Sequence, residues 1–78
     1  MDGPSSAAPL TAREVEVLAL VAIGRSAKEV ALQLGIAPCT VERHIENVRL
    51  KTRTRNRSHM VAVAIRDGLL ERVAAKPV

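Results

Sequence analysis

The chain has 78 residues, a formal net charge of +4 and no aromatic residue. This length allows one small domain, with no room for a deep enzymatic cleft beside a hydrophobic core that has to be built from aliphatic side chains. The composition excludes binding of single strands by base stacking on aromatic rings, and the one cysteine, Cys39, excludes an intramolecular disulfide and a cysteine-based zinc site.

Residues 1–9 have small side chains and two prolines, which predicts a disordered tail or linker. The pattern that follows predicts four helices and no strand, so the expected fold class is all-α, with one domain over residues 10–70. We expect residues 71–78 to form a frayed C-terminal tail.

Two capping boxes mark the first two helices. Thr11 with Glu14, and Ser26 with Glu29, have the spacing at which the hydroxyl accepts an amide proton and the carboxylate reaches back to the cap. Gly35 is expected to end the second helix, because glycine readily adopts the left-handed conformation that follows a helix.

The third helix is expected to begin at Pro38, since proline suits a first helical position. Apolar residues at i, i+4 and i+7 predict its buried stripe: Val41, Ile45 and Val48. Polar residues lie between them and are expected to point outward: Glu42, Arg43, His44, Glu46 and Asn47.

The fourth helix is expected to start after Asn56, a good capping residue, and to stop at Gly68. It is apolar nearly all round, which a lone surface helix should not be, so part of it should meet a partner. We assign Val61 and Ile65 to the core side. The remaining arc is the predicted interface of a weak homodimer: Met60, Val63, Ala64 and Asp67.

Positive charge is concentrated between Arg43 and Arg57, a stretch that contains six basic residues and one acidic residue, Glu46. Such a stretch is the electrostatic footprint of polyanion binding, although a solvated helix face followed by a basic loop has the same composition.

A short helix, a tight turn at Gly35 and a longer helix with a polar face form a helix-turn-helix pattern. Beyond this pattern, several strings over residues 10–70 resemble LuxR-type (NarL/FixJ-like) DNA-binding domains. They are Leu10-Thr11-x-Arg13-Glu14-x-Glu16-Val17-Leu18, Gly24-x-Ser26-x-Lys28-Glu29-Val30-Ala31, Leu34-Gly35-Ile36, Thr40-Val41-x-x-His44-Ile45-x-Asn47-Val48, Lys51, Arg55-Asn56-Arg57-Ser58, Val61-Ala62 and Gly68-Leu69-Leu70.

The resemblance implies a four-helix domain of a transcription regulator, or the excised DNA-binding domain of one, with its third helix in the major groove of double-stranded DNA. It also implies a two-fold dimer contact through the fourth helix, and RNA polymerase is a further partner to consider. The expected base-facing residues are Glu42, Arg43 and Glu46. The expected phosphate-facing residues, including those of the basic loop, are Thr40, His44, Asn47, Lys51, Arg53, Arg55 and Arg57.

Two acids on the groove-facing surface depart from the family pattern, in which the position of Glu42 is usually lysine. Carboxylates are repelled by phosphates, but they can accept hydrogen bonds from cytosine N4 amino groups. Alternatively, Arg43 and Glu46, which are separated by one helical turn, neutralise each other.

Two other functions fit parts of the sequence. A promoter-binding region of sigma-factor type has a similar opening and helix pair, but the predicted fourth helix argues against it. A protein-interaction module that has lost DNA binding would explain Glu42 and Glu46. No nucleophile–base pair, metal cluster or phosphate loop is present, so we expect neither an enzyme nor a cofactor. Without an apolar run of membrane-spanning length or a signal-peptide pattern, the expected location is cytoplasmic.

Overall fold

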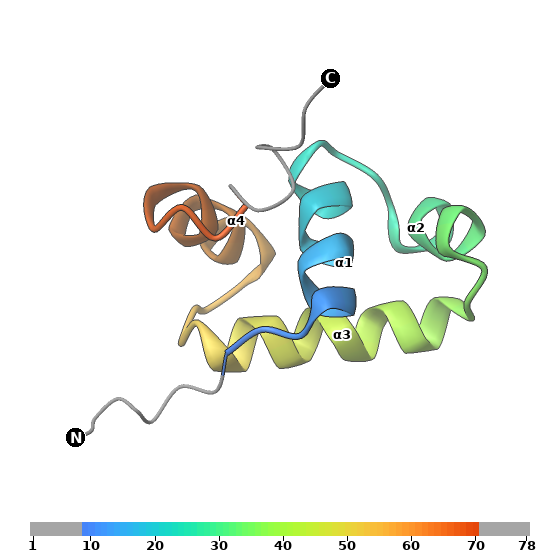
Figure 1. Ribbon diagram of the computed structural model, residues 1–78, viewed down its shortest axis with the longest axis horizontal. Coiled ribbons are helices and arrows are strands. Elements are labelled where there is room, and N and C mark those ends of the chain that lie inside the picture. The colour runs from blue at the N-terminus through green and yellow to red at the C-terminus, as the bar shows by residue number, and fades with distance from the viewer. Residues whose placement is uncertain (1–8, 71–78) are drawn as a thin grey trace.

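A computed structural model of the chain describes residues 9–70, which form four helices and no strand (Figure 1). The helices are α1 (Ala12–Ala22), α2 (Ala27–Leu34), α3 (Pro38–Lys51) and α4 (Arg57–Arg66). The all-α prediction is confirmed. The expected disordered tail over residues 1–9 and the frayed tail over 71–78 lie outside the described residues, apart from Pro9.

Local hydrogen bonds fix where the first two helices begin. The Thr11 hydroxyl accepts from Glu14 N–H at 3.1 Å, while Thr11 N–H donates to Glu14 Oε1 at 2.9 Å. Ser26 and Glu29 form the same reciprocal pair at 3.1 and 2.9 Å. Both predicted capping boxes are therefore confirmed, and each satisfies two amide groups that a helix start leaves without a backbone partner.

The turn between α2 and α3 depends on Gly35, which caps α2 with φ +70° and donates its N–H to Ala31 O at 2.8 Å. Glycine has no Cβ to oppose this left-handed conformation. Pro38 follows as the first residue of α3, as predicted, and Ala37 before it supplies no side-chain cap. Asn56 starts α4 by accepting from His59 N–H at 2.8 Å.

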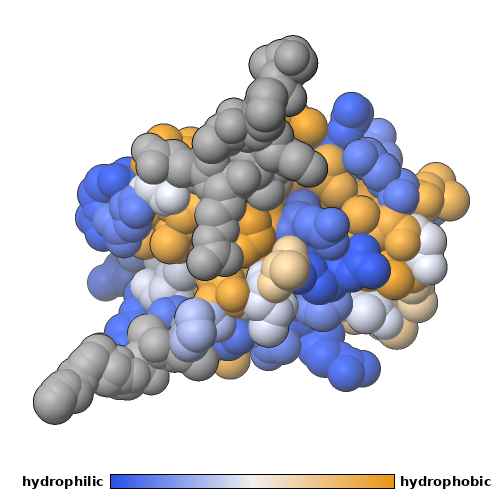
Figure 2. Space-filling model, in the orientation of Figure 1, coloured by the Kyte–Doolittle hydropathy of each residue, from blue (hydrophilic) through white to orange (hydrophobic). Residues whose placement is uncertain are grey.

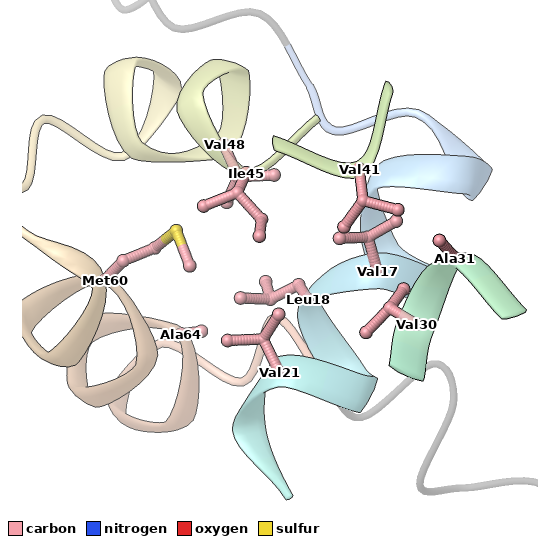
Figure 3. Close-up of a cluster of buried hydrophobic side chains, with 10 residues drawn as sticks. All are labelled: Val17, Leu18, Val21, Val30, Ala31, Val41, Ile45, Val48, Met60 and Ala64. Atoms are coloured by element: carbon pink, nitrogen blue, oxygen red, sulfur yellow. The ribbon is translucent and has the colours of Figure 1, made fainter. Parts of the chain in front are cut away.

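The core is a single aliphatic cluster to which all four helices contribute (Figure 3). α1 stands between α2 and α4, and these three helices lie on the same side of α3 (Figure 1). The predicted stripe of α3 is confirmed, because Val41, Ile45 and Val48 are all buried. Close packing of these side chains holds α3 by one face and leaves its opposite face outward.

The facing of α4 differs from the expectation. Ile65, assigned to the core, is 63% exposed, whereas Val61, assigned to the same side, is partly buried and packs against the core cluster. The core side is instead formed by Met60, Val63 and Ala64, so the predicted dimer interface through these three residues is wrong. Because α4 is apolar nearly all round, its own periodicity did not select a face. The selection comes from α1 and α3, because the long Met60 side chain points toward Leu18 of α1 and Ile45 of α3 (Figure 3).

Candidate nucleic-acid interface

α3 presents two distinct surfaces beside its buried stripe. The first, which we call the outer stripe, consists of exposed residues at i, i+4, i+7 and i+11: Cys39, Arg43, Glu46 and Leu50. The second, which we call the α1 flank, consists of half-buried residues with the same spacing: Thr40, His44, Asn47 and Lys51. The edge of the molecule formed by α3 is mostly hydrophilic in Figure 2.

Glu46 on the outer stripe is held by Arg49, one helical turn further along α3. The Arg49 Nε donates to Glu46 Oε1 at 3.0 Å, and its Nη2 donates to the other carboxylate oxygen. This forked hydrogen bond lowers the pKa of Glu46 below its usual range, so the carboxylate is ionised at neutral pH. The expected neutralisation of Glu46 by Arg43 is therefore wrong, since the guanidinium on Glu46 belongs to Arg49.

Arg49 has a second anchor, which sequence reasoning missed. Its Nη1 donates at 2.7 Å to the carbonyl oxygen of Thr54, in the turn between α3 and α4. Thr54 is itself buried, and its hydroxyl lies 3.0 Å from that of Thr52. The only sequence signal for this role is the i, i+3 spacing of Glu46 and Arg49.

Glu42 lies beside the outer stripe and forms an ion pair with α4. Arg57 Nη2 donates to Glu42 Oε1 at 3.0 Å across fifteen positions of sequence. Both side chains are about half exposed. Arg57, expected to contact phosphate, thus already has a carboxylate partner on the same surface.

Arg43 lies on the outer stripe between these two acids and is exposed. Among residues 9–70, no carboxylate lies within ion-pair distance of its guanidinium. The three expected base-facing residues are therefore brought together on one solvent-facing surface, with two carboxylates held by arginines and one unpaired guanidinium between them.

On the α1 flank, the Lys51 ammonium group bonds to residues outside α3. Its Nζ lies 2.8 Å from Glu14 Oε1 and 3.2 Å from Pro9 O. Burial alone raises the pKa of Glu14, but the hydrogen bonds from Lys51 and from Thr11 N–H outweigh it and leave this pKa below its usual value. Lys51, expected to face a DNA phosphate, thus has its ammonium group bonded to a buried carboxylate, and its phosphate contact stays a prediction that this pair disfavours.

The remaining phosphate-facing predictions differ in their surroundings. The Nδ1 of His44 is buried without a hydrogen-bond partner among the described residues, so only the Nε2 edge of the ring could meet a phosphate. Thr40 and Asn47 are half-buried, whereas Arg53 and Arg55 are exposed in the turn before α4. Phosphate contacts by these five residues stay predictions.

Residues 9–70 contain neither a metal-binding cluster nor a membrane-spanning helix. No group of three or more His, Cys, Asp or Glu side chains is gathered as a metal site would require. Of the helices in this range, none combines the length and the apolarity needed to cross a bilayer.

Comparisons with known proteins agree with this geometry. Residues 8–64 match the family described as bacterial regulatory proteins, luxR family. The chain is 43% identical over 67 residues to the transcriptional activator protein SolR of Ralstonia nicotianae, which is 86% of this chain and 28% of that protein. It is 37% identical over 65 residues to the transcriptional regulatory protein MctR of Rhizobium johnstonii (83% and 30%), and 40% identical over 62 residues to the probable transcriptional regulatory protein NarL of Mycobacterium tuberculosis (80% and 29%). The chain thus spans less than a third of these curated relatives.

Proposed function

Because the chain belongs to the luxR family of bacterial regulatory proteins, we propose that it binds double-stranded DNA with α3 in the major groove and regulates transcription by this binding. The observation that carries the proposal is the exposed surface of α3 formed by Glu42, Arg43 and Glu46, on a helix whose opposite face is buried in the core. An α-helix fits the width of the major groove. A DNA partner also supports the expected cytoplasmic location.

Contacts with base edges and contacts with phosphates are assigned to different regions of the domain. Arg43, with Glu42 and Glu46 beside it, would meet base edges and select the sequence, while Arg53 and Arg55 in the following turn would meet phosphates and supply affinity. Arg43 can form a bidentate pair with guanine O6 and N7. RNA polymerase as a further partner stays a prediction with no residue assigned.

A salt titration tests DNA binding. If Arg53 and Arg55 each neutralise one phosphate, log K should fall with log salt at a slope of about −1.8 per protomer, and Arg55→Ala should make this slope shallower by about 0.9. Arg66→Ala, at the far end of α4 and paired with Asp67, serves as the control and should leave the slope unchanged. Absence of binding to any duplex at low salt would instead favour the protein-interaction module.

We further propose that two copies pair weakly through the face of α4 opposite its buried residues. Ser58, Ala62 and Ile65 are exposed there at i, i+4 and i+7. Small residues beside the large apolar side chain of Ile65 suit close approach of the same helix from a second copy, as a two-fold contact requires. So small a patch is far below the area of a stable interface, which is about 1,200 Å², so pairing should occur mainly on adjacent half-sites.

A further inference from the structure

Two carboxylates, those of Glu42 and Glu46, are exposed on the surface of α3 that would face the groove. Resting on the DNA binding proposed above, we propose that Glu42 and Glu46 read cytosine amino groups, and that Arg49 and Arg57 are positioning residues that hold these carboxylates for this readout. The half-site would then contain C·G pairs at the positions facing the two acids.

The chemistry of the base edges favours cytosine over the other three bases. An ionised carboxylate has only acceptors, so it requires a donor on the base. In the major groove, guanine and the oxygen of thymine offer acceptors only and would repel it. Adenine places its N7 acceptor beside its amino group, whereas cytosine presents its N4 amino group without an adjacent acceptor.

Arg49 orients Glu46 more firmly than a surface ion pair usually does. Its guanidinium is fixed at one edge to the Thr54 carbonyl at 2.7 Å and uses its other edge to hold both carboxylate oxygens. The Arg49 side chain is 27% exposed, against 54% for Glu46, so the carboxylate projects beyond its clamp. Each carboxylate oxygen has a further lone pair, so Glu46 can accept from a base while it remains bound to Arg49.

Glu42 is held from another helix. Its partner Arg57 is the first residue of α4, so the direction of this carboxylate depends on how α4 packs against α3. Each arginine also offsets the repulsion between its carboxylate and the DNA phosphates. Two acids can therefore face the groove without abolishing binding, and Arg43 between them adds a donor for guanine.

Selection from a randomised duplex library, followed by sequencing of the bound fraction, measures base preference without a known operator. The parent domain should select half-sites with cytosine at two positions, at about tenfold preference each. Glu46→Gln should move one of these positions from cytosine toward adenine, because glutamine pairs with adenine N6 and N7. The other positions should not change.

Arg49→Ala should weaken the cytosine preference at the same position that Glu46→Gln changes, since the carboxylate is then free to turn away. Arg49→Lys, which keeps a cation beside the acid, should restore part of it. Thermal unfolding of each variant separates this effect from loss of the Thr54 anchor. Glu16→Gln is the matched control, because Glu16 is an exposed acid paired with Arg13 at the same spacing on α1.

Two results would overturn the inference. One is a parent preference that contains no C·G pair beyond the one that Arg43 would select. The other is a preference profile that neither Glu46→Gln nor Arg49→Ala changes, even if overall affinity does. Both leave the proposed function intact, since the domain still binds duplex DNA. Failure of the parent to retain any duplex would remove the proposed function and this inference together.

Discussion

The two surfaces of α3 both carry acid–base pairs, yet they use them differently. On the α1 flank, Lys51 bonds to Glu14, whose side chain is only 5% exposed. Beside and on the outer stripe, Glu42 and Glu46 pair with arginines but remain about half exposed. The first pair joins α1 to α3 and belongs to the fold, whereas the second kind lies on the surface that would meet DNA.

Burial explains the difference. A buried carboxylate that loses its partner is left without water to replace it, so the pair is costly to break. An exposed pair contributes little to stability, because water competes for both charges. Residue types alone therefore do not separate a structural pair from one available to a ligand.

The contrast between buried and exposed residues also holds on α4, where it gives the largest expected effect on stability. Val63→Glu places a charge among buried side chains and should lower the free energy of unfolding by about 3 kcal/mol or more. Ile65→Glu, on the exposed face, should leave thermal unfolding nearly unchanged but abolish cooperative binding to a duplex with two half-sites. Melting curves and half-site titrations check both. A stably folded Val63→Glu domain would contradict the facing of α4.

Breaking the buried pair should have the next largest effect. Glu14→Gln keeps the shape of the side chain but leaves Lys51 without its counter-charge, which we expect to cost about 2 kcal/mol. For a domain of this size, the melting temperature would fall by roughly 10 °C. Glu46→Gln should change it by less than about 3 °C, as an exposed pair would. Equal losses in the two variants would remove the distinction between the surfaces.

Acid should act on the same buried pair. The pKa of Glu14 is lower in the folded domain than its ordinary value of 4.5, so the unfolded chain takes up this proton more readily. The stabilisation is complete above that ordinary value and is lost as pH falls through the lower, folded pKa. Melting temperatures measured from pH 7 to pH 3 should fall less steeply for Glu14→Gln than for the parent domain. Parallel curves would show that Glu14 is not linked to acid unfolding.

The smallest expected effect is on the salt dependence of DNA binding. It compares Lys51, on the α1 flank, with Arg55, in the turn before α4. Lys51→Ala should leave the salt slope of DNA binding unchanged, because the Lys51 ammonium group bonds to Glu14 and Pro9 instead of a phosphate. Arg55→Ala should reduce the slope by about 0.9. Titrations below the melting temperature of each variant make the comparison. A reduced slope for Lys51→Ala would return this lysine to the DNA contacts.

Much of the architecture could be predicted because its causes are local. The Thr11–Glu14 and Ser26–Glu29 boxes and the glycine cap at Gly35 depend on residues within one helical turn. The stripe of Val41, Ile45 and Val48 was readable because polar residues separate its members, so periodicity singles out one face. The gathering of Glu42, Arg43 and Glu46 on one outward surface follows from the same periodicity.

Local patterns in the amino-acid sequence account for the helix starts, the aliphatic core, the family likeness and the outward face of α3. Packing between helices selected the buried side of α4, because a helix that is apolar nearly all round has no distinct apolar face until α1 and α3 cover one side of it. It also decided the partners of the charges. Lys51 lies 37 positions from Glu14, and Arg57 lies 15 from Glu42, so these pairs exist only because packing brings their helices together.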